Sequence, residues 1–171
     1  MTIQDFNLYT ARGYEGDLVD SGPRVIQTGI LTDATAGFGK AMQRDVSVER
    51  GVALGTTEVG TSETANVYAI SQREYNHEAG TRPSAGNDTT YLITESVSLI
   101  RQGYIYISVD TTDNAVVAGD PVHVTLATGV FSMADLQTDT ILPCVNVIAD
   151  ESVAVGSGTA VIIKARIDIV A

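Results

Sequence analysis

The chain has 171 residues and a mass of 18.0 kDa, which fits one domain with or without an arm. A chain of this length can bury a hydrophobic core that needs no disulfide bond or metal to stabilise it. Its 10 Lys and Arg against 21 Asp and Glu give a net charge of −11, which argues against nucleic-acid binding and against an anionic membrane surface. One cysteine excludes an intrachain disulfide, and no apolar run is long enough to cross a bilayer. We also expect no secretory signal, because the first residues lack basic and apolar regions.

Residues 1–22 differ from the rest of the chain, because apolar and aromatic side chains occur there without a regular period. Such groups have no core of their own, so we predict an N-terminal arm over 1–22 that packs on its own domain or on a neighbouring subunit. One domain then covers 23–171. The alternative, in which the segment is a first strand and loop of that domain, stays open. The side chains predicted to make subunit contacts are Phe6, Leu8, Tyr9, Tyr14 and Leu18.

The first strands of the domain are predicted from an alternation of apolar and polar residues. Residues 24–31 form the first candidate, with Ile26 and Ile30 on one face. Two more candidates cover residues 37–44 and 67–74.

Two stretches of this first half are predicted as loops. Residues 51–65 are rich in Gly, Thr and Glu, and residues 76–89 are polar throughout with turn-forming Gly and Pro. We expect the second stretch to be a surface excursion.

The second half of the domain shows clearer alternation. A strand over 90–100 is followed by another over 103–110, in which Ile105, Ile107 and Val109 share one face. The other face of the second strand carries tyrosines, whose rings can pack while their hydroxyls stay in contact with water.

The last strands follow a turn. Residues 120–127 alternate, further strands are predicted at 130–131 and 144–150, and residues 159–171 form a closing strand of about ten residues. The one short helical candidate is 133–139. About ten short strands separated by turns predict an all-β fold, a compact β-barrel or β-sandwich of short antiparallel strands.

Sequence motifs for chemistry are missing. His77, His123 and Cys144 do not have the spacing of a metal site, and the aspartates around residue 113 lack the EF-hand pattern. There is no nucleophile elbow and no phosphate-binding glycine loop. We therefore predict no enzyme, no catalytic residues, no cofactor and no metal. We therefore expect the sheet edges and the arm to be the surfaces that bind other protein chains.

Three stretches together carry a resemblance to a known family. The first has the pattern G-x-L-x-D-x-x-P followed by an aliphatic residue, the second is a glycine with alternating isoleucines, and the third is a G-D-P-V turn and strand ending near G-x-F. The residues concerned are Gly16, Leu18, Asp20, Pro23, Val25 or Ile26, then Gly103, Ile105 and Ile107, then Gly119, Asp120, Pro121, Val122, Val124, Gly129 and Phe131. With these features the chain resembles, from about residue 14 to residue 167, the structural cement (head decoration) proteins of tailed bacteriophages.

The resemblance implies a virion protein made in the host cytoplasm and located on the outer capsid surface. It implies binding to the major capsid protein and to copies of itself, often as trimers. The charge and the missing motifs add the expectation of no nucleic acid, membrane or cofactor as partner. The five arm side chains would then lie at subunit or capsid contacts.

Two other functions stay open. A tail or carbohydrate-binding module would stack sugars on tyrosines, although the strand positions of these tyrosines favour packing. A β-fold hydrolase would need two convergent carboxylates, and no pair stands out among the acids. The tyrosines considered are Tyr68, Tyr75, Tyr91, Tyr104 and Tyr106.

Overall fold

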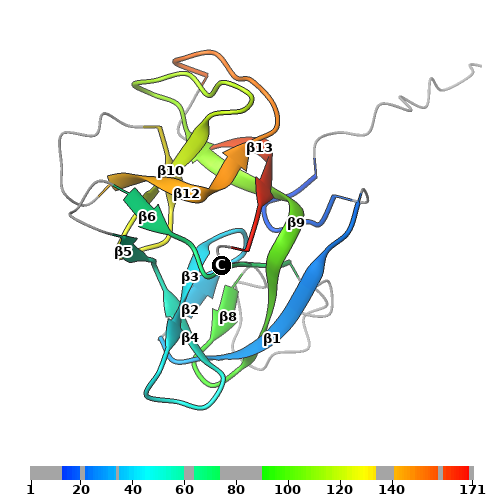
Figure 1. Cartoon of the computed structure of the whole chain (residues 1–171), viewed down its shortest axis with the longest axis vertical. Helices are drawn as coiled ribbons and strands as arrows, with labels where there is room; N and C mark the ends of the chain where they lie inside the picture. The colour runs from blue at the N-terminus through cyan, green and yellow to red at the C-terminus, as the bar shows by residue number, and fades with distance from the viewer. Residues whose placement is uncertain are drawn as a thin grey trace, which may run out of the picture.

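The computed structural model describes residues 13–19, 22–33, 35–59, 64–73, 90–133, 141–157 and 160–169. These ranges contain β-strands and no helix, which confirms the predicted all-β fold (Figure 1). The strands are β1 (Val25–Leu31), β2 (Thr35–Gly37), β3 (Ala41–Asp45), β4 (Gly51–Leu54), β5 (Thr57–Val59), β6 (Thr64–Asn66), β7 (Ala69–Ser71), β8 (Thr90–Leu92), β9 (Ser96–Asp110), β10 (Pro121–Thr125), β11 (Phe131–Ser132), β12 (Ile141–Ala149) and β13 (Val161–Ile167).

Five strands close into a ring, which we call the first barrel. Its order is β1, β4, β3, β7 and β9, and β9 pairs back with β1. The β1–β4 pair is parallel and the other four pairs are antiparallel. The buried side chains of its core are Leu31, Ala36, Phe38, Met42, Val52, Ala69, Tyr91, Val97 and Leu99.

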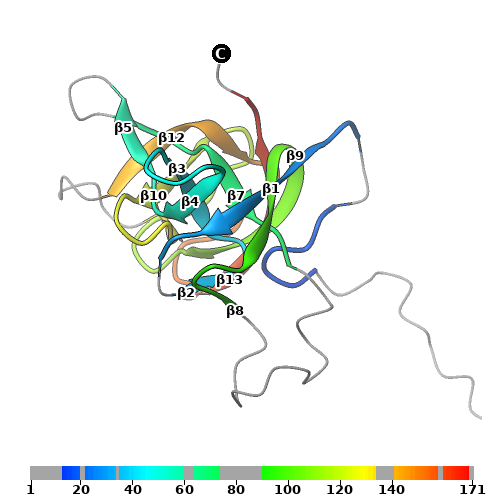
Figure 2. The same cartoon turned by 90° about the horizontal axis from the view of Figure 1, so that it is seen from below.

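A second ring shares β9 with the first, and we call it the second barrel. Its order is β9, β11, β10, β12 and β13, and β13 pairs back with β9. Here β9–β11 is the parallel pair. Strand β6 pairs with β12 outside this ring, β5 pairs with β6, and β2 and β8 form a separate two-stranded sheet. Figure 1 shows β9 running between the group of β10, β12 and β13 and the group of β1, β3 and β4, and Figure 2 gives the view from below.

The two rings meet at Gly103 in the middle of β9. Residues before it pair with β1, and residues from Gly103 onward pair with β13. Gly103 has a φ of 126°, and a Cβ at this position would lie 3.1 Å from the Cβ of Arg24. The prediction of two strands divided here was wrong. A glycine in a left-handed conformation lets one long strand bend from one barrel into the other.

One further expectation was wrong. The stretch 51–65 was predicted as a loop, but it holds β4, β5 and the start of β6, which are too short to show a period. Ile26 and Ile30 share one face of β1, as predicted, but Ile26 is exposed, and the core-facing side carries Gly29 and Leu31. The sequence does not show which face is buried, because Gly29 occupies a core-facing position without a side chain, at the point where Val52 packs.

The alternation predicted for the longest strands is confirmed. Ile105, Ile107 and Val109 are fully buried on one face of β9, and Ile163 and Ala165 pack beside them from β13. The loop predicted over 76–89 and most of the short helical candidate, residues 134–139, lie outside the described residues.

Candidate interaction surfaces

The N-terminal contact residues divide into two groups. Outside the described residues lie Phe6, Leu8 and Tyr9. Tyr14 is 66% exposed, whereas Leu18 is half-buried against the core of the second barrel and forms a β-bridge with Ile105. The part of the segment that the structure describes therefore holds one outward-facing and one inward-facing member of the predicted set.

Residues 13–19 form backbone hydrogen bonds with β9. The Gly16 amide donates to the Tyr106 carbonyl at 2.8 Å, and the Tyr106 amide donates to the Asp17 carbonyl at 2.9 Å. The Val19 amide donates to the Tyr104 carbonyl at 3.1 Å. This segment thus adds backbone pairing to its own domain.

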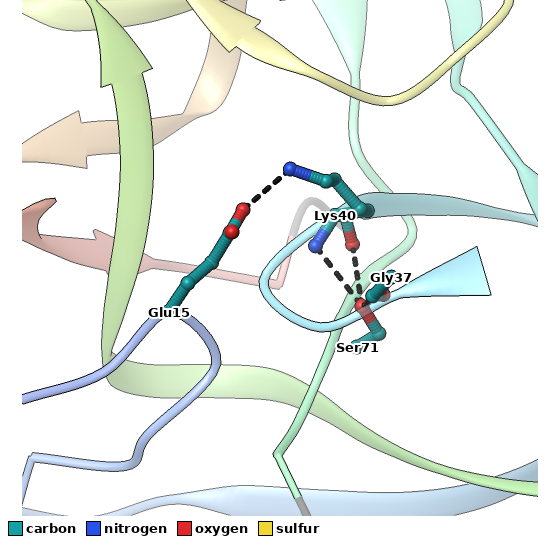
Figure 3. Close-up of polar contacts among 4 residues, drawn as sticks. All are labelled: Glu15, Gly37, Lys40 and Ser71. Carbon is teal, nitrogen blue, oxygen red and sulfur yellow. Dashed lines mark hydrogen bonds and ion pairs between the residues drawn. The ribbon is translucent and has the colours of Figure 1, made fainter. Parts of the chain in front are cut away.

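An ion pair fixes the same segment to the turn between β2 and β3. The Glu15 carboxylate lies 2.5 Å from Lys40 Nζ, as drawn in Figure 3. Below it, the Ser71 hydroxyl accepts a hydrogen bond from the Lys40 amide at 3.0 Å and donates to the Gly37 carbonyl at 2.8 Å. The turn that carries Lys40 therefore contacts both Glu15 and Ser71. These contacts attach residues 13–19 to the first barrel.

The exposed ring of Tyr14 forms part of a small cationic-aromatic surface. The Arg73 guanidinium lies 4.8 Å from the centre of the Tyr14 ring and 5.4 Å from the centre of the Phe38 ring. Cation–π contact of this kind stabilises an exposed site by about 0.5–1 kcal/mol, so the ring is oriented although it faces solvent.

A second surface is the mouth of the first barrel. The inward row of β9 runs from Val97 through Leu99 to Arg101, and Arg44 occupies the equivalent end position on β3 opposite Val52. The barrel interior therefore changes from apolar to cationic at this end. We define the mouth by the side chains of Gln27, Arg44, Val46, Val48, Glu49, Arg50, Tyr68 and Arg101.

The mouth encloses a hollow of about 640 Å³. A neighbouring hollow of about 340 Å³ shares Arg44, Val46, Tyr68 and Arg101 with it and extends to Asn146 and Ile169. The two hollows therefore lie side by side, next to the place where the two barrels meet.

The cations of the mouth are incompletely paired. The Arg44 side chain forms no hydrogen bond or ion pair with any residue that the structure describes. The Arg101 guanidinium stacks 4.4 Å from the centre of the Tyr68 ring, and its Nε is buried without a hydrogen-bond partner. Arg50 donates through Nη2 to the Thr28 carbonyl at 2.9 Å. The mouth thus carries three arginines against one glutamate, which suits an anionic ligand.

Asn146, which lines the smaller hollow, joins the segment between β6 and β7 to the segment that follows β13. Its side-chain oxygen accepts from the Val67 amide at 3.0 Å, and its nitrogen donates to the Val67 carbonyl at 2.7 Å and to the Asp168 carbonyl at 3.0 Å. The residue is only 4% exposed. One amide therefore satisfies backbone groups from both neighbouring segments.

Sequence reasoning missed the mouth, because its arginines are dispersed along the chain. The signal that could have found it is the alternation of β9: the apolar positions 97 and 99 are followed at the next inward position by Arg101. A charged residue at the end of an inward row points to a barrel mouth.

The described residues contain no arrangement for catalysis or metal binding. No group of three His, Cys, Asp or Glu side chains among them could hold a metal ion. Cys144 is buried, and burial raises the pKa of its thiol far above the usual range. In this part of the chain no helix is long and apolar enough to span a membrane.

The tyrosines considered for sugar stacking do not form one patch among the described residues. Tyr91 is fully buried and donates from its hydroxyl to the Gln72 carbonyl at 2.6 Å. Tyr68 lies under Arg101, and Tyr104 lies under Lys164 Nζ at 4.4 Å. Tyr75 lies outside the described residues.

The chain matches the family described as structural cement protein (E217 gp24/Pam3 gp6) over residues 2–166. A chain of the solved structure titled "The capsid of Myoviridae Phage XM1" superposes with a TM-score of 0.64 at 15% sequence identity, covering 98% of each chain. At this identity the likeness shows a shared fold. Among curated proteins, none matches the sequence.

Proposed function

The chain belongs to the structural cement protein family of phages, and from this premise we propose that it binds the outer surface of the major capsid protein shell and stabilises it. Family membership gives the chain a structural role in a phage capsid, and it points to a non-enzymatic protein. The observation that carries the proposal is the family match over nearly the whole length of the chain.

The physical mechanism that we propose is linkage. A protein that binds the assembled shell more tightly than its separated subunits shifts the equilibrium toward the shell. A standard interface buries about 1,600 Å² in total, so many copies together add a large resistance to opening. Two closed barrels that share a strand suit this task, because a stiff body transmits load between the subunits it bridges.

We further propose that the chain acts as a homo-oligomer, as a trimer, with the N-terminal segment at its contacts. Phe6, Leu8 and Tyr9 would contact the shell or a neighbouring copy. Tyr14 would mark where the arm leaves the domain, because residues 13–19 are bonded to β9 while the Tyr14 ring faces outward.

The experiment that tests this proposal mixes the purified chain with expanded, undecorated shells and counts the copies bound. We expect saturable binding that decreases with added salt, because a net charge of −11 favours basic patches on a partner. Absence of binding at low salt would remove the proposal.

A matched deletion tests the role of the arm. Removing residues 1–12 leaves the Glu15–Lys40 ion pair and the pairing with β9 in place. We expect weaker shell binding with an unchanged unfolding temperature. Equal loss of binding and of folding would contradict an arm that works mainly in assembly.

A further inference from the structure

The mouth of the first barrel and a pair of turns in the second barrel have opposite character. In Figure 1 the turn between β3 and β4, which borders the mouth, lies at the lower end of the long axis. The turns at residues 111–120 and 150–157 lie together at the upper end. A β-bridge between Val116 and Val153 joins these two turns, with backbone hydrogen bonds of 3.0 and 2.9 Å. We call the joined turns the acidic end.

The mouth is cationic in a strongly acidic protein. Three arginines line it against one glutamate, although acids outnumber basic residues two to one in the whole chain. Val46, which is 87% exposed, and Val48 add apolar surface at its border. An anionic group flanked by aliphatic side chains would complement this surface.

The acidic end carries that combination. Residues 111–120 and 150–157 contain no Lys or Arg. Asp113 and Asp120 are exposed, and their carboxylates have no partner among the described residues. Val117 is 50% exposed and Val155 is 55% exposed beside them.

We propose that the acidic end of one copy docks in the mouth of a second copy, head to tail. Asp113 and Asp120 of one copy would face the guanidinium groups of Arg44 and Arg101 of the next, where opposite charges meet. The exposed valines of both surfaces become buried in the same contact. This inference rests on the proposed self-association of the chain and adds a second contact to the one proposed for the N-terminal segment.

A head-to-tail contact uses two different patches, so it can be tested by complementation. Arg44→Glu damages the mouth and leaves the acidic end intact, whereas the double variant Asp113→Asn, Asp120→Asn does the reverse. We expect the mass of the wild-type chain to rise with concentration in sedimentation equilibrium. Each variant alone should associate at least about tenfold more weakly. An equal mixture should regain association, because the intact acidic end of one variant can still enter the intact mouth of the other.

The matched control is Arg24→Glu. Arg24 is exposed and lines neither hollow, and the substitution makes the same change in net charge as Arg44→Glu. We expect it to associate like the wild-type chain, and all variants should unfold at the wild-type temperature.

Three results would overturn the inference: a wild-type mass that stays that of one chain, a mixture that does not associate, or an Arg24→Glu variant as defective as Arg44→Glu. Shell binding of Arg44→Glu is measured in parallel. If that variant binds shells while the wild-type chain shows no self-association, the cement proposal stands and the head-to-tail contact is wrong.

Discussion

The two barrels follow the same plan and differ in how their interiors end. Each is a ring of five strands with one parallel pair, and each uses part of β9. The β9 positions inside the second barrel are Ile105, Ile107 and Val109, all fully buried. Those inside the first barrel change from Val97 and Leu99 to Arg101, which faces the mouth.

This difference shows how one architecture can serve two purposes. Ring closure decides which residues point inward, and the last inward residue decides whether that end is packed or left open for binding. In this chain the second barrel has the larger apolar core, and the first barrel provides the cationic depression.

The largest expected effect comes from removing core side chains in each barrel. Ile107→Ala in the second barrel and Leu99→Ala in the first should each lower the free energy of unfolding by about 2–5 kcal/mol. Because β9 runs through both rings, each variant should shift one common transition, measured in denaturant by far-ultraviolet circular dichroism. Two separate transitions would mean that the barrels unfold independently.

The seam between the barrels should be nearly as sensitive. Asn146→Ala leaves both backbone groups of Val67 and the Asp168 carbonyl without their partner, which should cost about 2–3 kcal/mol of unfolding free energy. Asn114→Ala is the matched control, since this exposed amide makes one bond, to the Met133 carbonyl. Equal losses for both variants in chemical unfolding would show that Asn146 does not join the barrels.

The bend in β9 should give a smaller effect. Gly103→Ala places a Cβ in a left-handed conformation and 3.1 Å from Arg24 Cβ, so we expect a loss of about 1–2 kcal/mol in thermal unfolding. Gly119→Ala separates the two causes, because Gly119 also has a positive φ, of 95°, but nothing within 4 Å of its added Cβ. If Gly103→Ala costs no more than Gly119→Ala, the close approach to Arg24 is unimportant.

The smallest effect concerns acid. The Asp110 carboxylate accepts hydrogen bonds from the hydroxyl and amide of Thr112, which lower its pKa, and Asp45 has the same arrangement with Ser47 in the first barrel. A lowered pKa stabilises the fold above the ordinary carboxyl range, and this contribution is lost as the pH falls through the lowered value.

The variants Asp110→Asn and Asp45→Asn should therefore approach wild-type stability as the pH falls from about 5 to about 2, in denaturant unfolding at each pH. A difference from wild type that stays constant over this range would exclude the ionised carboxylates as its cause.

The sequence allowed the all-β class and the longest inward rows to be predicted, because β9 and β13 repeat a period of two over many residues. It did not reveal the closure into two rings. Ring closure depends on β4 and β11, which have four and two residues, and on Gly29, where a core-facing position carries no side chain. The mouth was missed for a related reason, since Arg44 and Arg101 become neighbours only when β3 and β9 close the same ring.

The central claim is that this chain strengthens a capsid by binding it from outside, and the most direct measurement is the thermal disruption of expanded shells by calorimetry, with and without the chain. We predict that saturating amounts raise the temperature of shell disruption and that the gain diminishes when residues 1–12 are removed. A disruption temperature that is unchanged by a saturating amount of bound chain would contradict the claim.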